Sequence, residues 1–462
     1  TSNIGELMII LGTNSIKETG FNVDNSCRFD GSSSYLQKTY ANGQNKTFSI
    51  STWVKRSELG DAGAIWSSYH NATNYLTLAF KDDDALRFQN VSAGVNMNFT
   101  TNRLFRDVSA WMHILAIVDT TDGTAGDRQQ IFINGVRETS FSTSNAYALN
   151  AAAELGATDK ENIVGRHGSG ADYFDGYMAE HFFIDGLALA PTSFGEFDED
   201  SGIWKPIDVS GLTFGTNGFY LDFENSGALG ADVSGNTNNF TVNNLTAIDQ
   251  STDTCTNNFA TLNPLNVNPS SAGDTFSEGN LKLATNSNSN SAGSTATMAF
   301  TKGKWYAEVK YTSATAWNGV MPTDATINGD TGRINWYQGR TLYLSGSNTA
   351  NWGSVVSAGD IVGIALDMDN FRVTISQSGQ WWGGSSFNQA QPHTFQALIS
   401  GYDTWTFLCA SGSGTSTSEW NFGSPPYAIS SGNTDGDGYG NFEYAVPSGY
   451  YSLNTKNLAE YG

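Results

Sequence analysis

Short apolar runs flanked by turn residues recur along this chain. Within residues 111–137, the runs 114–118 and 131–133 are separated by a segment rich in Gly, Asp and Thr, and Asn134-Gly135 closes the second run. Runs rich in β-branched residues between turn signals predict strands, and Asn-Gly is a strong turn signal. Because the first run is apolar on both faces, we predict a hairpin, or a near neighbour of one, whose first strand is central in a β-sandwich.

The same pattern recurs in the second half of the chain. Residues 361–367 form an apolar run that ends in Asp, and after a turn at 368–370 a second run covers 371–376, which Gly379 closes. Both copies consist of an apolar strand, a turn, a second strand and a turn of small residues. We therefore predict two domains of similar sandwich architecture in tandem.

Alternation of apolar and polar residues marks further strands. Residues 48–54 alternate strictly, and residues 304–311 alternate with Trp305 and Tyr311 facing inward and Glu308 facing outward. Residues 75–80 and 85–88 flank a Lys-Asp-Asp-Asp turn and predict another hairpin. Two further expectations are a strand at 219–223 and one helical turn at 191–196. In residues 178–185, the alternation places four side chains on one face: Met178, Glu180, Phe182 and Ile184.

Length and composition narrow the class of protein. A chain of 462 residues predicts two or three domains, and 50 glycines with only 9 prolines suit an all-β protein with many tight turns. The net charge of -22 makes nucleic acid and anionic membranes poor partners, because phosphate binding needs Lys and Arg. The longest aliphatic patch near a terminus, residues 7–11, is too short to span a membrane and lacks the basic segment of a secretion signal. We expect it to dock onto the protein itself or onto a neighbouring subunit.

Cysteines and aspartates offer little metal chemistry. Cys27, Cys255 and Cys409 lie far apart without a CxxC motif, so we expect three buried thiols rather than a disulfide framework or a zinc site. Residues 82–84 are three consecutive aspartates that form either a solvated turn or a structural Ca²⁺ site. Adjacent residues rarely converge on one ion, which favours the solvated turn. We therefore predict no cofactor.

Several stretches of the first half carry a family resemblance. FDGSSSYL, FSISTWVK, WMHILAIVD, IFINGVR, IVGR and YFDGYMAEHFFIDGLALAP, taken in order, resemble the laminin-G/concanavalin-A-like jelly-roll domains. The run FIDGLALAPTSFGE, followed by WKP at 204–206, is similar to the version in tail and appendage proteins of marine bacteriophages. This resemblance covers residues 21–210 and implies a β-sandwich.

The second half resembles a related sandwich. GKWYAEV, GDIVGIALD, VTISQSG and NFG are similar to SPRY domains, and the ending NFGSPP with PSGYYSLN is similar to the phage variety. The match covers residues 265–455. It departs from the family in an insert at 321–354, which we expect to form polar loops on a binding edge. Between the halves, the Asn-rich residues 211–264 either form a connector or supply a permuted strand to the first sandwich.

The sequence gives little evidence for catalytic residues. Residues 196–200 superficially resemble the E-x-D-x-E of jelly-roll glycosidases, but they follow the Pro191 turn rather than lie on a strand that lines a cleft. His113 and His181 fall inside strands and are expected to be core residues. His70, His167 and His393 fall in expected loops without a nucleophile motif. We therefore predict no catalytic residues and no enzyme activity.

A binding surface is the remaining interpretation. Saccharides are held by aromatic platforms and polar groups, since a sugar ring has an apolar face and a hydroxyl rim. Trp381 and Trp382 follow a strand, and because neighbouring side chains point to opposite faces, we expect at least one to point outward or into a rim. With Trp352 and Tyr337 of the insert, they are the candidate ligand-binding residues. The alternative is that these rings cap the core or make subunit contacts.

The sequence therefore predicts an all-β protein of two tandem concanavalin-like jelly-roll β-sandwiches, laminin-G-like and then SPRY-like. The predicted parts are an arm at 1–20, the first sandwich at 21–210, the connector at 211–264 and the second sandwich at 265–462. The resemblance implies a non-enzymatic phage virion protein, homo-oligomeric, that binds a host-surface glycan or a neighbouring virion protein as a tail fibre, appendage or surface decoration. The alternatives are a purely structural tail or capsid component and a glycan depolymerase.

Overall fold

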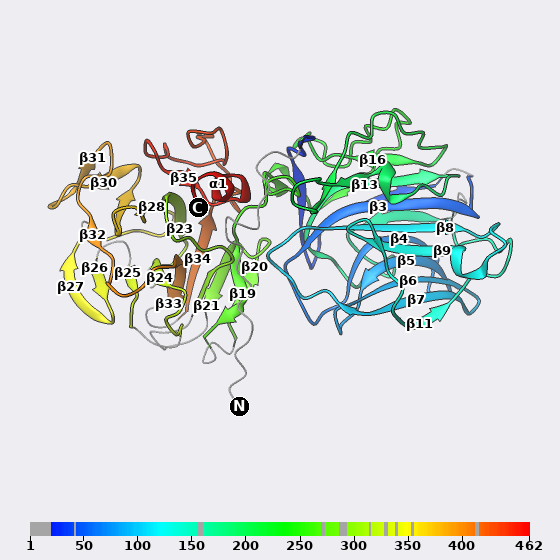
Figure 1. The fold of residues 1–462 in the computed structure, drawn as a ribbon, viewed down its shortest axis with the longest axis horizontal. Helices are drawn as coiled ribbons and strands as arrows, with labels where there is room; N and C mark the ends of the chain where they lie inside the picture. Colours follow the sequence, from blue (N-terminus) through cyan, green and yellow to red (C-terminus); the bar gives the residue numbers. More distant parts are fainter. Residues whose placement is uncertain are drawn as a thin grey trace. The chain divides into compact units, whose positions relative to one another are not determined.

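The computed structural model describes residues 20–40, 43–155, 160–268, 273–285, 293–313, 316–327, 331–337, 341–352, 355–411 and 415–462. The predicted arm, with its aliphatic run at 7–11, lies outside the described residues apart from Gly20. Strands make up most of the regular structure, and the helix α1 (Thr455–Tyr461) lies near the C-terminal end (Figure 1). The described ranges contain no helix with the length and apolarity needed to cross a membrane.

The chain divides into two compact units between Thr256 and Asn257. We call residues 20–256 the N-terminal domain and residues 257–462 the C-terminal domain. Each contains two large, mainly antiparallel sheets around its own apolar core, so the predicted fold class, all-β with two tandem sandwiches, is confirmed.

Two eight-stranded sheets form the N-terminal domain. The first has the order β10-β9-β8-β3-β13-β1-β18, with β16 also paired to β13, and its strands are β1 (Ser26–Asp30), β3 (Thr47–Arg56), β8 (Met112–Asp119), β9 (Gln129–Ile133), β10 (Val136–Arg137), β13 (Asp175–Asp185), β16 (Phe219–Leu221) and β18 (Gln250–Ser251). The second has the order β11-β7-β6-β5-β4-β12-β2-β17, with strands β2 (Tyr35–Thr39), β4 (Gly63–Asn71), β5 (Asn74–Phe80), β6 (Ala85–Ser92), β7 (Val95–Leu104), β11 (Phe141–Asn145), β12 (Glu161–Val164) and β17 (Thr241–Asn243).

The predicted hairpin at 111–137 is present and central. β8 pairs with β9 on one side and with β3 on the other. The Asn134-Gly135 turn, with both residues at positive φ, joins β9 to the short β10, so it closes the next hairpin along the chain rather than this one. The hairpins β5–β6 and, in the C-terminal domain, β28 (Ile361–Asp367) with β29 (Arg372–Gln377) are confirmed as well.

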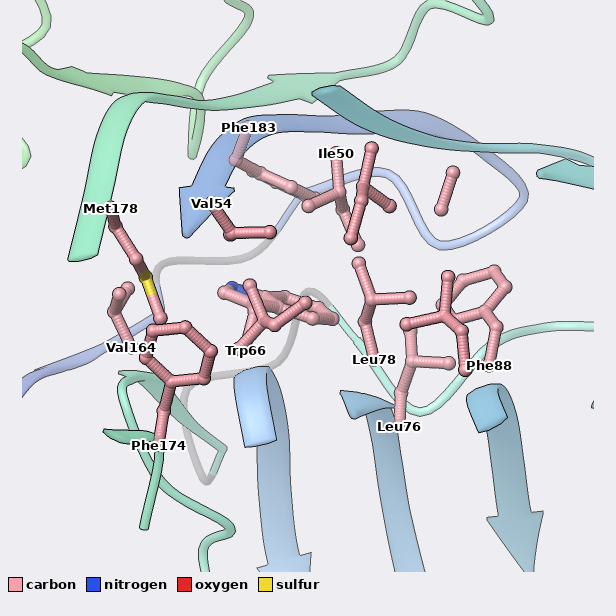
Figure 2. Packing of buried hydrophobic residues seen from close by; sticks show 14 of the residues in the cluster. Ile50, Val54, Trp66, Leu76, Leu78, Phe88, Val164, Phe174, Met178 and Phe183 are labelled. Atoms are coloured by element: carbon pink, nitrogen blue, oxygen red, sulfur yellow. The ribbon is translucent and has the colours of Figure 1, made fainter. Parts of the chain in front are cut away.

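Apolar side chains from the two sheets meet in one core. Figure 2 shows Ile50, Val54 and Phe183 of one sheet above Trp66, Leu78 and Phe88 of the other. The rings of Trp66 and Phe183 stack with centroids 5.8 Å apart. The core is therefore a continuous layer between the sheets, and ligands would have to bind at its ends or outer faces.

Strand β13 departs from the predicted alternation. Its pairing with β3 shifts register between Ala179 and Phe182, where Glu180 has a φ of 48°. An extra residue in a strand reverses the side-chain parity beyond it. Met178 and Phe183 therefore both face the core, while Phe182 and Ile184 face a separate cluster on the outer side. The prediction that Met178 shares a face with Phe182 and Ile184 is wrong for this reason.

Residues 211–256 belong to the first sandwich and not to a linker. β16 pairs with β13, β17 pairs with β2, and β18 pairs with β1, so this segment adds strands to both sheets. Residues 187–206 also pack on the outer face of the first sheet through the 3-10 turn Pro191–Ser193 and the small sheet of β14 (Gly195–Phe197) and β15 (Trp204–Pro206). The first sheet thus has apolar clusters on both faces.

The C-terminal domain is the second sandwich. One sheet has the order β19-β22-β33-β24-β25-β26-β27, with strands β19 (Leu262–Val267), β22 (Gly293–Ala296), β33 (Trp405–Ser411), β24 (Ala316–Pro322), β25 (Ile334–Tyr337), β26 (Thr341–Leu344) and β27 (Ser347–Asn351). The other has the order β20-β21-β34-β23-β28-β29-β30-β31, with strands β20 (Thr275–Ser277), β21 (Lys282–Thr285), β34 (Ser416–Asn421), β23 (Lys304–Tyr311), β30 (Gln380–Trp382) and β31 (Phe387–Gln389), and with β32 (Gln396–Ala397) and β35 (Tyr451–Ser452) at its side.

The insert at 321–354 and the outer face of β23 (Lys304–Tyr311) differ from expectation. The insert at 321–354 contributes β25, β26 and β27, which extend a sheet, so describing it as loops is wrong for those residues. The alternation of β23 is confirmed, with Trp305 and Tyr311 in the core. Its other face is also covered, because Phe442 and Tyr450 pack against Tyr306 there.

A buried ion pair ties the end of the N-terminal domain to its central strand. Lys55 Nζ lies 2.7 Å from Asp253 Oδ2, with both side chains 1% exposed. Trp111 Nε1 donates to the other carboxylate oxygen at 2.9 Å. Removal of one partner from such a pair leaves an uncompensated buried charge.

We expect Asp253→Ala to lower the free energy of unfolding by about 3–5 kcal/mol. The matched control is Asp127→Ala, whose ion pair with Arg137 is 36–40% exposed and should contribute less than about 1 kcal/mol. Urea denaturation of the full chain measures both. Equal losses in the two variants would show that the pair does not hold the segment in place.

Candidate functional site

The three tryptophans predicted to bind a ligand lie in the interior of the C-terminal domain. Trp381, Trp382 and Trp352 are 2%, 4% and 6% exposed. The rings of Trp352 and Trp382 stack with centroids 5.6 Å apart. Trp381 packs on the opposite face of β30, where its ring centroid lies 6.2 Å from that of Tyr306. Neither Trp381 nor Trp382 points outward to solvent, because both faces of β30 are covered.

Tyr337 lies apart from these rings. It is half-buried and packs edge-on against Trp317, with centroids 5.7 Å apart. The structure therefore brings Trp352 and Trp382 together and leaves Trp381 and Tyr337 in two other clusters. The assignment of the four residues to a ligand stays a prediction.

Two histidines are core residues, as predicted. His113 is fully buried, with Nε2 2.8 Å from Ser51 Oγ and Nδ1 accepting from Trp204 Nε1 at 3.2 Å. His181 is fully buried against Phe219. Burial lowers the pKa of each imidazole to about 3, so both are neutral and structural. His70, expected in a loop, instead lies in β4.

The acidic run at 196–200 forms a small hairpin rather than a catalytic pair. Glu196 lies on the short strand β14, which pairs with β15 in a two-stranded sheet. Asp198 accepts hydrogen bonds from Ser201 and Lys205, which lower its pKa to about 2. A glycosidase acid needs a raised pKa, so Asp198 does not suit that role.

The other predicted acids and thiols also have structural positions. Asp82 and Asp83 are exposed, but Asp84 turns inward and binds Arg56 and Arg106 at 3.1 and 2.8 Å, so the solvated-turn interpretation is wrong for Asp84. Among the described residues, no group of three His, Cys, Asp or Glu is arranged to hold a metal ion. All three cysteines are free: Cys27 and Cys409 are buried, and Cys255 is partly exposed.

The sequence analysis did not predict that two carboxyl groups, those of Glu180 and Glu308, are buried. Glu180, at the bulge of β13, is 4% exposed and accepts hydrogen bonds from Tyr220 Oη at 2.9 and 3.0 Å. Burial raises its pKa to about 8. Glu308 is fully buried and accepts from the backbone N–H groups of Glu443 and Tyr444. Burial raises its pKa to about 7, although these bonds oppose the shift. Both carboxyls are enclosed, so they connect elements rather than meet a substrate.

A solvent-open hollow lies at one end of the N-terminal sandwich. It is shallow and forms where residues 57–62, between β3 and β4, meet residues 165–174, between β12 and β13. We call it the loop-end pocket. Its lining residues are Arg56, Glu58, Asp61, Ala62, Gly63, Phe80, Tyr173, Phe174 and Asp175.

Backbone hydrogen bonds hold the two loops of this pocket together. Ser57 N–H donates to the carbonyl of Asp175 at 3.1 Å, and Ala64 N–H donates to that of Asp172 at 2.9 Å. Gly60 N–H donates to the buried Asp84 carboxylate at 2.9 Å. The pocket is therefore anchored to the sheets on both sides, which suits a preformed binding site.

The walls combine an aromatic ring with charged groups. Tyr173 is half-buried and packs edge-on against Tyr35 at 6.3 Å, and the guanidinium of Arg166 lies 3.9 Å from the Tyr35 ring. Glu58 and Asp61 are exposed at the rim. Such a mixture of aromatic face and hydrogen-bond acceptors is what a polyhydroxylated ligand requires. No sequence motif marks this pocket, because its lining residues come from separate stretches between 56 and 175.

We expect Trp382→Ala to lower the free energy of unfolding by about 3–5 kcal/mol, because it opens a cavity beside Trp352. Phe371→Ala is the control: Phe371 is 44% exposed at the turn before β29, and its loss should cost less than about 1 kcal/mol. Chemical denaturation compares the two. Unchanged stability of Trp382→Ala, with loss of ligand binding, would instead support the ligand role predicted from the sequence.

We expect stability of the C-terminal domain to fall with rising pH through Glu308. Its folded pKa of about 7 lies above the ordinary 4.5, so between these values the folded state holds the proton more strongly than the unfolded state. Its contribution is fully present below pH 4.5 and is lost as pH rises to about 7, a change on the order of 3 kcal/mol.

Urea denaturation at several pH values tests this in Glu308→Gln, which should lose that slope, and in Glu460→Gln, an exposed control that should keep it. Equal slopes in Glu308→Gln and the unmodified chain would contradict the expectation.

Comparisons with solved structures include three distant likenesses. The SAP-like pentraxin from Limulus polyphemus is 15% identical over 36% of this chain and 78% of that chain, with a TM-score of 0.27. The SPRY domain of human HERC1 is 13% identical over 34% and 96%, with a TM-score of 0.28. Domain 4 of AbnA, an arabinanase from Geobacillus stearothermophilus in complex with arabinotriose, is 16% identical over 36% and 73%, with a TM-score of 0.28. At these scores the likenesses carry no argument about ligands.

Comparison with families gives a defined match in the N-terminal domain. No curated protein matches the chain. Every residue that lines the loop-end pocket lies between 56 and 175. That span falls within residues 30–186, which match the family described as the concanavalin A-like lectin/glucanases superfamily.

Proposed function

We propose that this chain is a non-enzymatic protein of a bacteriophage particle that binds a host-surface glycan through the loop-end pocket. The observation that carries the binding role is the pocket itself, in which Tyr173 stands beside Glu58 and Asp61 within the stretch that matches the lectin/glucanase family. The phage assignment, with a place in a tail fibre, appendage or surface decoration, rests on the sequence resemblance of residues 21–210 and 265–455.

The chemistry of the pocket rim supports a saccharide ligand. The hollow is shallow and open to solvent, so a saccharide would lie across its rim rather than enter it. A ring face can pack on Tyr173, while hydroxyl groups donate to the rim carboxylates. Repeated copies in a homo-oligomer would strengthen weak binding through avidity.

Specific observations favour two alternatives to glycan binding, a structural role and a depolymerase activity. A purely structural component, bound to neighbouring virion proteins, is favoured by the C-terminal domain, whose candidate ligand tryptophans are buried. A depolymerase would need two carboxyl groups beside a bound sugar, one with a raised pKa. Glu58 beside Asp61 is the pair to examine, because partial burial and the charge of Asp61 raise the pKa of Glu58.

We expect Tyr173→Ala to weaken glycan binding by roughly tenfold or more, because an aromatic ring at the centre of a site supplies much of its affinity. Phe197→Ala removes a 49% exposed ring on the β14–β15 hairpin and should leave affinity unchanged. A glycan array followed by titration of the best glycan measures both variants. Equal affinities in the two variants would remove the pocket from the proposal.

The same glycan separates the alternatives. A binding protein leaves the viscosity and the reducing ends of the polysaccharide unchanged on incubation. Cleavage that Glu58→Gln abolishes would establish a depolymerase instead. Absence of any glycan ligand, with the chain located inside the tail or shell by imaging of the virion, would establish the structural role.

A further inference from the structure

We infer that the outer face of the second N-terminal sheet binds an acidic saccharide, whose carboxylate or sulfate group is held by two arginine side chains. The surface consists of Tyr69, Tyr75, Arg87, Arg166 and His167, and we call it the arginine–tyrosine surface. The inference goes beyond the proposed function, because none of these five residues lines the loop-end pocket.

Three aromatic rings mark this surface. Tyr69 of β4 pairs with Tyr75 of β5, and His167 lies in the segment that follows β12. The imidazole packs edge-on against both tyrosines, with centroid distances of 5.6 and 4.8 Å. All three side chains are half-buried, so each keeps part of its surface in contact with solvent. Such rings offer an apolar face to a sugar ring, and tyrosine adds a polar hydroxyl group.

Two arginines bring positive charge to the same region. Phe88 of β6 points into the core, so its neighbour Arg87 points to the outer face of the sheet. Arg166 follows β12 by two residues, and the carbon at the centre of its guanidinium lies 3.9 Å from the centre of the Tyr35 ring. Both arginines are half-buried.

Neither arginine has a partner for its charge in the part of the chain that the structure describes. The Nε atoms of Arg87 and Arg166 are buried there without a hydrogen-bond acceptor. Arg56 and Arg106, by contrast, share the carboxylate of Asp84. A buried donor without an acceptor is costly, and in a chain with 45 acidic and 23 basic residues an unpaired arginine is unexpected. The two arginines therefore indicate a place for an anion from outside the chain.

The two arginines act on one point of the surface. Burial lowers the pKa of His167, the charge of Asp172 opposes this shift, and the charges of Arg87 and Arg166 add to it. Both guanidinium groups are therefore within electrostatic reach of the same imidazole. Asp172 supplies one negative charge against two positive ones, so a bound anion would relieve the remaining repulsion.

A saccharide with a single acidic group fits these features. A guanidinium donates charge-assisted hydrogen bonds to a carboxylate or sulfate, often two in parallel, while the aromatic rings contact the apolar face of the sugar. A long polyanion such as nucleic acid fits less well, because the field of a chain with a net charge of -22 repels it during approach.

The test titrates the full chain with D-glucose, D-glucuronate and D-glucose 6-sulfate by ligand-observed NMR at about pH 7, where both acidic groups are ionised. We expect at least one acidic sugar to bind roughly three- to tenfold more tightly than glucose, as partly exposed charge-assisted hydrogen bonds allow. The acidic sugar that binds more tightly identifies the anionic group. The preference should shrink in about 0.5 M NaCl.

Two double variants of equal charge change locate the effect. Arg87→Gln with Arg166→Gln should bring the three affinities within about twofold. Because these guanidinium groups make no hydrogen bond to the described part of the chain, the midpoint of urea unfolding should stay unchanged. Arg103→Gln with Arg137→Gln removes the same charge at exposed positions and should keep the preference.

A third variant separates hydrogen-bond geometry from charge. Arg87→Lys with Arg166→Lys keeps both positive charges but removes the parallel donation, and it should lose part of the preference while the chain stays folded.

Each remaining outcome overturns the inference. Equal affinities of the three sugars for the unmodified chain, or no measurable binding by any of them, would do so. A preference that persists in the Arg87/Arg166 glutamine variant, or that the Arg103/Arg137 control loses equally, would assign it to the other cations of the chain. The proposed function is tested at Tyr173 and not at these arginines, so either proposal can fail while the other stands.

Discussion

Burial of both faces of one sheet in each domain is the constraint on which the rest of this structure depends. In the N-terminal domain, the sheet that contains β3, β8 and β13 carries the main core on one face and two smaller apolar clusters on the other. In the C-terminal domain, the sheet that contains β23 and β28 has its outer face covered by residues that include Phe442 and Tyr450. Each domain therefore has a third, irregular layer built from chain that returns across a sheet.

This third layer explains where the unusual carboxyl groups lie. Glu180 and Glu308 occupy outward-facing positions of strands that a two-layer sandwich would leave in water. Burial raises the pKa of both. Glu308 accepts hydrogen bonds from the backbone of residues 443–444 in the covering segment, whereas Glu180 accepts from Tyr220 of the neighbouring strand β16. These buried acceptors connect the strands to the chain packed beside them.

The same constraint decides what could be predicted from the sequence. The strands at 48–54, 112–119, 304–311 and 361–367 were predictable, because alternation and paired apolar runs report directly on a sheet with a core. The burial of Trp381 was not predictable from the sequence. Its exposure depends on distant residues that cross the sheet, and residue-by-residue alternation holds no information about them.

The candidate site was unpredictable for a related reason. Its ring, Tyr173, and its rim acids, Glu58 and Asp61, come from two loops that the pairing of β3 with β13 and of β4 with β12 brings together. Neither loop carries a motif by itself. The family resemblance indicated the sandwich to which these loops belong, but the buried Asp84 that anchors Gly60 became evident only from the folded chain.

Strand β13 connects the site to this architecture. It begins at Asp175, which lines the loop-end pocket, and it ends among residues that pack under the outer layer. A regular strand of this length would keep one face inward throughout. The bulge at Glu180 instead lets Met178, near the pocket, and Phe183, farther along, both enter the core. The positive φ of Glu180 costs on the order of 1–3 kcal/mol and persists only because surrounding contacts determine it. The geometry of the pocket and the covering of the sheet are therefore properties of the same strand.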